Sequence, residues 1–424
     1  MSQATRILVA LLLGLAAGIV AAAKVPHFAE QAISVAQPVG TAWLNALRMT
    51  IVPLVVALLV TGIGTTARAA RASRLAGRAI LLFLVLLWIS AAIGAFATPL
   101  FLSLWPADSA SAAALRESFS HAVVPGEIPA FSEFLAAIVP TNPVAAAAND
   151  AFLPLILFTT VFAFAVTRLP GGPRETLTGF FQALADAMLV MIHWVLLLAP
   201  IGVVALAFVV GARAGAGAVG ALLHYVLIVA GVGCVLWALA YPLAWLGGGV
   251  RIGAFARAVA PSQAVAVSTQ SSLASLPAML TSAERLGVPV ASSGVTLPLA
   301  VAIFRVTGPC MNIAVAIYVA HIFGIHLGPA QLAAGVAAAA ITTLGAVSLP
   351  GSISYISSIA PIAVAMGVPV EPLALLVAVE TLPDIIRTVA NVTMDVAVTS
   401  VIARRSGSTE ERTEADALLA GGDA

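Results

Sequence analysis

The sequence predicts an all-α membrane protein with eight transmembrane helices and two re-entrant helical hairpins. The first observation behind this prediction is composition. Of the 424 residues, 61% are apolar and 9% are charged, whereas a soluble domain carries roughly 25% charged residues. The second is that the apolar residues gather in runs of about 18 or more, the length that crosses a bilayer. The third is a pair of apolar segments that small polar residues and a proline interrupt.

The same composition excludes a soluble enzyme, a disordered protein and a nucleic-acid-binding protein. A net charge of +1 gives no basic surface for DNA or RNA. Cys234 and Cys310 both lie in apolar runs, so the sequence indicates neither a disulfide framework nor a metal cluster. No cofactor is expected, and the apolar runs lack the histidine or serine spacings that are typical of an intramembrane enzyme.

The predicted helices and hairpins differ in how their apolar runs are interrupted. The helices are expected at residues 6–23, 41–63, 78–102, 151–167, 180–211, 218–246, 293–324 and 374–403. The hairpins are expected at 256–283 and 331–366, which are broken near Ser268–Pro277 and Gly345–Ser352. Because proline lacks an N–H donor and backbone groups at membrane depth must be paired, each broken segment predicts a helix, a turn and a returning helix.

Basic residues in short loops predict the orientation of the chain. Arginines gather between the second and third runs, before the first hairpin and after the last run. The charged residues of the loop 103–150, in contrast, are mainly acidic. Both termini are therefore expected in the cytoplasm, with 405–424 as a disordered tail. The hairpins then enter from opposite faces, and such paired broken segments are typical of alternating-access transporters.

The last run contains four ionisable side chains, although a charge at membrane depth costs roughly 2.5 kcal/mol or more. Besides Glu380, these are Asp384, Arg387 and Asp395, which share one helical face with Asn391. This face could bind a small zwitterion or anion, with Arg387 gripping a carboxylate and Asp384 receiving an ammonium group. Asn391 and Asp395 could hold a cation or a proton. The alternative is a buried ion-pair network without a ligand.

The two hairpin tips supply further candidate substrate ligands. Ser271 and Ser272 at the first tip, and Ser348, Pro350 and Gly351 at the second, offer hydroxyls and backbone N–H groups that attract anions. The alternative is that small residues at the tips only allow close helix packing.

Arg305 lies near the middle of the seventh run, within Ile303-Phe-Arg-Val-Thr-Gly-Pro-Cys310. Glycine and proline so close to a buried charge predict a broken helix. A role in the protein interior, paired with an acid of the last run, is favoured over a side chain that reaches out to the membrane surface.

Three stretches of this sequence resemble one known family. Asp384-Ile-Ile-Arg-Thr-Val-Ala-Asn-Val-Thr-Met-Asp395 is similar to the pattern Asp-x-x-Arg-Thr-x-x-Asn-x-x-x-Asp of the last helix of glutamate transporters, the dicarboxylate/amino acid:cation symporters. Ile138–Pro143 together with Leu153–Phe158 resembles the start of that family's fourth helix, and Leu47–Leu54 resembles its second. The resemblance extends over residues 6–404.

The resemblance implies a homotrimer in the bacterial cytoplasmic membrane, surrounded by lipid. Each protomer would consist of a scaffold and a moving transport domain. The scaffold would comprise residues 1–77 and 103–215, and the transport domain 78–102, 216–250, the hairpins 251–288 and 327–368, and the helices 289–326 and 369–404. Thr388 and Asn391 would bind further substrate groups. The presence of both Asp384 and Arg387 favours an acidic amino acid over a C4-dicarboxylate.

One departure from the family concerns the coupling ion. Where the family's seventh helix has Asn-Met-Asp-Gly-Thr, this chain has Phe304-Arg-Val-Thr-Gly308. Phenylalanine and valine side chains offer no oxygen to a hard cation, so we expect two sodium sites to be degraded. We expect Arg305 to replace a sodium ion by pairing with Asp395 or with the substrate. A proton on Glu380, Asp384 or Asp395 is favoured as the coupling ion.

Other functions remain open at this stage. They are uncoupled exchange, sodium-coupled symport, an anion channel, and a relative that has lost transport.

Overall fold

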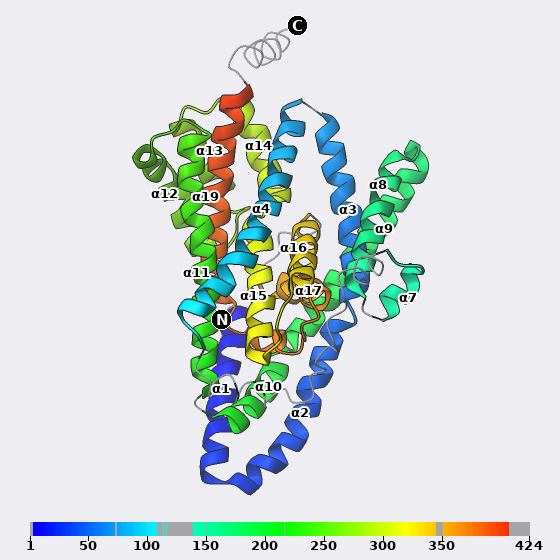
Figure 1. Ribbon diagram of the computed structural model, residues 1–424, viewed down its shortest axis with the longest axis vertical. Coiled ribbons are helices and arrows are strands. Elements are labelled where there is room, and N and C mark those ends of the chain that lie inside the picture. Colours follow the sequence, from blue (N-terminus) through cyan, green and yellow to red (C-terminus); the bar gives the residue numbers. More distant parts are fainter. Residues whose placement is uncertain are drawn as a thin grey trace.

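The computed structural model shows a helical protein (Figure 1). It describes residues 3–72, 74–107, 139–149, 151–215, 217–344 and 351–406, with Ala113 and Arg116. This part of the chain contains no strand, as the fold class predicts. Seven of its helices are long and apolar enough to cross a membrane, one fewer than expected. The difference is α8 (Phe152–Arg168), whose 17 residues rise about 25 Å against a hydrocarbon core about 30 Å thick.

The helices form two groups that pack mainly among themselves. Besides α8, the first group contains α1 (Gln3–Lys24), α2 (Pro26–Arg48), α3 (Ile51–Ala72), α9 (Gly171–Leu197) and α10 (Ala199–Ala214). In this group α1 and α2 pack on α10, and α3 packs on α8 and α9. Figure 1 shows α1, α2 and α10 at the lower end of the molecule and α8 and α9 along one side.

The second group surrounds the last helix. It contains α4 (Arg74–Leu104), α11 (Gly217–Leu246), α12 (Ile252–Thr269), α13 (Leu276–Arg285), α14 (Val290–Ile303), α15 (Thr307–Phe323) and α19 (Thr381–Ser406). Here α11, α12 and α14 pack on α19, and α4 packs on α15. Two further helices, α16 (Pro329–Thr343) and α17 (Gly351–Ala365), pack on each other and contact members of both groups. The short helices α7 (Pro143–Ala148) and α18 (Leu373–Leu376) complete the described elements.

Prolines in the first turn of a helix explain several breaks that the apolar runs do not reveal. The expected helix 180–211 is wrong as a single element, because α9 ends at Leu197 and α10 begins just before Pro200. Likewise, the expected helix 41–63 is divided between α2 and α3. Proline is tolerated in a first turn, where its missing N–H has no intrahelical partner, whereas inside a helix it removes a backbone hydrogen bond and kinks or ends the helix.

The last helix also begins later than expected. The apolar run predicts residues 374–403, but α19 begins at Thr381, with Pro383 in its first turn. Glu380 therefore lies in the turn before the helix and not within it. Its backbone carbonyl accepts a hydrogen bond from the amide of Asp384 at 2.9 Å. A carboxylate at this point is stabilised by the partial positive charge of the helix N-terminus.

The predicted break in the seventh run is present. α14 ends at Ile303 and α15 begins at Thr307, which leaves Arg305 in a non-helical connection. The first interrupted segment forms the packed helices α12 and α13, joined by residues 270–275. The second forms α16 and α17, but the tip between them, at 345–350, lies outside the described residues.

Glycines allow a close contact between α1 and α10 in the first group. Gly14 and Gly18 of α1 are spaced as in the small-xxx-small pattern of membrane helix pairs. A Cβ atom at Gly18 would lie 2.2 Å from the backbone oxygen of Phe208 on α10. A Cβ atom at Gly211 of α10 would lie 2.4 Å from the backbone oxygen of Leu15. Backbone atoms cannot move aside as flexible side chains can, so these positions require glycine.

We predict that Gly18→Ala lowers the thermal melting temperature of the purified protein by several degrees, because overpacking costs about 1–3 kcal/mol. Gly64→Ala is the matched control, because a Cβ atom there meets nothing within 4 Å. The control should melt at or slightly above the wild-type temperature, since alanine favours helix more than glycine does. Equal melting temperatures for the two variants would contradict the packing of α1 on α10.

Candidate functional site

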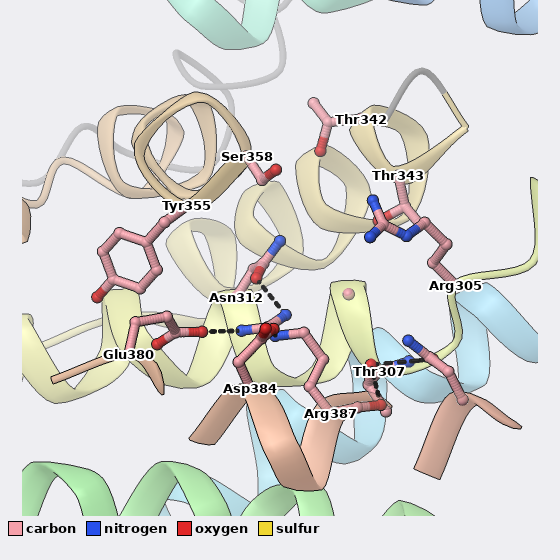
Figure 2. A pocket seen from close by; sticks show the side chains of 12 residues that line it. Arg305, Thr307, Asn312, Thr342, Thr343, Tyr355, Ser358, Glu380, Asp384 and Arg387 are labelled. Carbon is pink, nitrogen blue, oxygen red and sulfur yellow. Dashed lines mark hydrogen bonds and ion pairs between the residues drawn. The ribbon is translucent and has the colours of Figure 1, made fainter. Parts of the chain in front are cut away.

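A polar cavity lies where the break between α14 and α15 faces the start of α19. Its volume is about 40 Å³, and it is lined by Arg305, Thr307, Gly308, Asn312, Thr342, Thr343, Tyr355, Ser358, Glu380, Asp384, Arg387 and Asn391. Figure 2 shows side chains from the break, from α15, α16 and α17, and from α19 converging on it. The cavity therefore combines residues of the second group with residues of the α16–α17 pair.

Arg387 is the most fully engaged side chain in the cavity. Its Nη2 lies 2.8 Å from Oε1 of Glu380, and its Nη1 donates to Oδ1 of Asn312 at 2.9 Å (Figure 2). Its Nε lies 3.6 Å from Oδ1 of Asp384, one helical turn earlier. Removing a guanidinium from water is costly unless charged and polar acceptors replace the water. These acceptors on three sides are what allows Arg387 to be buried here.

Glu380 is held by two tyrosines as well as by Arg387. Its side chain is buried, and its Oε2 accepts a hydrogen bond from the hydroxyl of Tyr225 on α11 at 3.4 Å. The hydroxyls of Tyr225 and Tyr355 lie 2.7 Å apart. Because Tyr225 donates to Glu380, Tyr355 on α17 is the donor to Tyr225. This chain of hydrogen bonds joins α11, α17 and the turn before α19.

Asn391 supplies a hydrogen-bond acceptor to the backbone at the break between α14 and α15. Its Oδ1 accepts hydrogen bonds from the backbone N–H of Thr307 at 3.0 Å and from the hydroxyl of Thr307 at 2.9 Å. The carbonyl of the same peptide unit, that of Val306, accepts a hydrogen bond from the hydroxyl of Ser90 on α4. Unpaired backbone groups at membrane depth are costly. The carbonyl oxygen of Asn391 is therefore committed to the break, although the residue also lines the cavity.

Arg305 enters the cavity opposite Glu380. In Figure 2 its guanidinium lies beside Thr343, whereas Tyr355 and Glu380 lie on the other side. The residues on either side of Arg305 face away from water: Phe304 is buried and stacks on Phe83 with ring centroids 4.6 Å apart, and Val306 is also buried. Residues 304–306 therefore offer the cavity the positive charge of Arg305 but no side-chain oxygen.

Four of the site residues predicted from the sequence line the cavity from α19 or the turn before it. They are Glu380, Asp384, Arg387 and Asn391. Arg305 joins them from the break. The predicted polar face of the last helix therefore lines the cavity along the first turns of α19.

Other predicted site residues lie elsewhere. Thr388 is buried, and its hydroxyl donates to the backbone carbonyl of Asp384 at 2.9 Å. Asp395 does not line the cavity; it is 1% exposed, and its Oδ1 has no hydrogen-bond partner within the described part of the chain. The pairing of Arg305 with Asp395 therefore stays a prediction.

The predicted ligands of the first hairpin tip do not line the cavity. Ser271 and Ser272 lie in the turn between α12 and α13, where the hydroxyl oxygen of Ser271 accepts a hydrogen bond from the amide of Ala274 at 3.2 Å. Gly351 is the first residue of α17. Ser348 and Pro350 lie outside the described residues.

Several residues that line the cavity, or support it as Tyr225 does, have no distinguishing feature in the sequence. Asn312 is a single amide in an otherwise apolar helix, and Tyr225 and Tyr355 are two of four tyrosines in the chain. Thr342, Thr343 and Ser358 lie on the α16–α17 pair. The available signal was a lone polar side chain inside an apolar run, but hydroxyls and amides also occur in membrane helices as packing or backbone partners.

This arrangement is suited to recognising a small polar molecule with carboxylates. Two guanidinium groups and two carboxylates line the cavity, so with all four ionised its net charge is zero. Hydroxyls and amides fill the spaces between the charges and can donate to carboxylate oxygens. A planar guanidinium is the side chain best matched to a carboxylate.

Comparison with known proteins agrees with this geometry. The profile of the sodium:dicarboxylate symporter family matches residues 4–405. A proton/glutamate-aspartate symporter of Escherichia coli is 27% identical over 377 residues, which cover 88% of this chain and 85% of that protein. A proton/sodium-glutamate symport protein of Bacillus caldotenax is 26% identical over 84% of each chain. A C4-dicarboxylate transport protein of Ralstonia nicotianae is 28% identical, covering 98% of this chain and 92% of that protein.

These matches confirm the resemblance to the glutamate transporters and exclude the interpretation as an enzyme. The chain is an integral membrane protein and a transporter, and it belongs to the sodium:dicarboxylate symporter family.

Proposed function

We propose that this protein is a secondary active transporter of an acidic amino acid, with C4-dicarboxylates as the second candidate substrates. The observation that carries this proposal is the cavity in which Arg387 and Asp384 lie 3.6 Å apart. Arg387 can bind a carboxylate of the substrate, and Asp384 can bind its ammonium group. A dicarboxylate without an amine would leave Asp384 facing a like charge. Relatives named as glutamate-aspartate and C4-dicarboxylate transporters support both substrate classes.

The coupling ion in this proposal is a proton rather than sodium. The connection between α14 and α15 contributes Phe304 and Val306, which are buried and apolar, and the carbonyl of Val306 already accepts from Ser90. Sodium is a hard cation that binds oxygen ligands, and Arg305 places a permanent positive charge in the same connection. A second cation there would be repelled. A relative named as a proton/sodium symporter makes sodium the alternative.

Charge balance also favours a proton. The four ionised groups of the cavity sum to zero, whereas aspartate or glutamate carries a net charge of −1. Enclosing the substrate in a low-dielectric site with one proton restores a net charge of zero, and burying an unbalanced charge is costly. In this proposal sodium is replaced partly by Arg305 and partly by the proton.

Transport would proceed by movement of the second helix group against the first. The two groups pack mainly within themselves, and the α16–α17 pair lies between them. The second group with this pair corresponds to the proposed transport domain, and the first group to the scaffold of a homotrimer. α4 begins with Arg74 and α19 ends with Arg404 and Arg405 at the same end of the molecule (Figure 1). By the positive-inside rule, this end faces the cytoplasm of a bacterial inner membrane.

We predict that purified protein in liposomes accumulates radiolabelled L-aspartate when the outside is made acidic, because protons then enter with the substrate. An imposed sodium gradient at equal pH on both sides should give no accumulation. A potassium gradient of the same size is the control for ionic strength. Accumulation that follows the sodium gradient would contradict the proposed coupling, and saturable counterflow of aspartate distinguishes a transporter from a channel.

We predict that Asp384→Asn weakens aspartate binding by about 30-fold or more, because loss of a buried charge partner costs about 2 kcal/mol or more. Succinate, which has no ammonium group, should bind the variant as well as or better than the wild type. Asp186→Asn is the matched control, since Asp186 is exposed on α9 and its carboxylate bonds to Gln182. An equal loss of aspartate and succinate binding in Asp384→Asn would contradict the proposal that Asp384 binds the ammonium group.

A further inference from the structure

The carboxylate-binding side of Arg387 is already occupied by a carboxylate of the protein itself. Oε1 of Glu380 lies 2.8 Å from Nη2 of Arg387, and Asn312 occupies Nη1 at 2.9 Å. A substrate carboxylate that bound Arg387 through both of its outer nitrogens would need the position that Glu380 now holds. Glu380 and the substrate therefore compete for the same donors.

Glu380 has a second set of partners that do not depend on Arg387. Its other oxygen, Oε2, accepts from Tyr225 at 3.4 Å, and Tyr225 is hydrogen-bonded to Tyr355 at 2.7 Å. A phenolic oxygen accepts as well as donates. A protonated Glu380 can therefore donate to this tyrosine pair when it leaves Arg387, whereas an ionised Glu380 would lose its principal counter-charge.

We propose that Glu380 is a tethered substitute for the substrate carboxylate and the site of the co-transported proton. Without substrate, ionised Glu380 occupies Arg387. When substrate binds, its carboxylate takes over Arg387, and Glu380 takes up one proton and turns to the Tyr225–Tyr355 pair. This inference rests on the proposed function and assigns its proton to one residue. The cavity remains at zero net charge in both states when the substrate is aspartate.

The other acids near the cavity are less suited to carry this proton. The charged and titratable groups that face Glu380 are Arg387 and Asp384 on α19, Tyr225 on α11 and Tyr355 on α17, with Arg305 across the cavity. Asp384 contacts only the Nε side of Arg387, at 3.6 Å, and an ammonium group beside it favours its ionised form. Asp395 does not line the cavity. Glu380 alone among these acids holds the outer nitrogen that a substrate needs.

The test is the pH dependence of L-aspartate transport by Glu380→Gln in liposomes. In the wild type, the KM for aspartate should rise with pH, approaching about tenfold per unit, because substrate must displace an ionised Glu380 and bind with one proton. In Glu380→Gln the KM should be independent of pH between about pH 5.5 and about pH 8. Aspartate exchange should persist in this variant, but accumulation driven by an acidic exterior should be lost.

Glu30→Gln is the matched control, since Glu30 is an exposed carboxylate on α2. It should retain the wild-type pH profile and gradient-driven accumulation. A wild-type pH profile with gradient-driven accumulation in Glu380→Gln would overturn the proposal while leaving the transport function intact. If the wild type itself transports no aspartate, the proposed function fails instead.

A second variant keeps the proposal testable if Glu380→Gln does not fold. Glu380→Asp retains a titratable carboxyl group but shortens its reach to Arg387, so it should compete less strongly with the substrate. Its KM at about pH 8 should fall below the wild-type value by about tenfold. A KM equal to or above the wild-type value at this pH counts against competition between Glu380 and the substrate.

Discussion

The guanidinium of Arg387 must be neutralised and hydrogen-bonded inside the membrane protein, and the surrounding structure supplies its partners. Glu380 lies at 2.8 Å, Asn312 at 2.9 Å and Asp384 at 3.6 Å. Each partner comes from a different local feature: the turn before α19, the first turns of α15, and the first turn of α19. Glu380 lies in the turn before α19, and from there its carboxylate contacts both Arg387 and Tyr225. The binding property of the site thus depends on where the helices are broken.

The breaks themselves depend on a small number of polar side chains. Thr307 begins α15 because Asn391 accepts its backbone N–H, and the carbonyl of Val306 is paired with Ser90. Without these partners, the open backbone would be exposed to a low-dielectric interior. The same side chain, Asn391, joins the break to α19. The connection that contains Arg305 and the helix that contains Arg387 are therefore fixed to each other, which holds two positive charges on opposite sides of one cavity.

The sequence predicts the class of the fold and the centre of the site for clear physical reasons. Charges are so costly in apolar runs that Asp384, Arg387 and Arg305 stand out without any structure, and glycine with proline marks the break beside Arg305. The start of α19 was less predictable, since residues 374–380 are apolar enough to continue a helix, and only Pro383 indicates the boundary. The division of 180–211 at Leu198 was missed because Pro200 lies in an otherwise unbroken apolar run.

The partners of the charges were not predictable from the chain. Tyr225 precedes Glu380 by 155 positions, and nothing in an apolar helix shows which face meets a distant turn. Asn312 looks like a packing residue until Arg387 is seen beside it. The serines of the first tip, Ser271 and Ser272, have the composition of an anion site but lie in a turn away from the cavity.

The most direct test of competition between Glu380 and the substrate for Arg387 is the number of protons taken up when substrate binds. Titration calorimetry of the purified wild-type protein with L-aspartate, repeated in two buffers of different ionisation enthalpy, measures this number. Because aspartate displaces an ionised glutamate from Arg387, we predict uptake of about one proton per aspartate bound near pH 8. Binding with no proton uptake at this pH, or binding that occurs only when sodium is added, would contradict it.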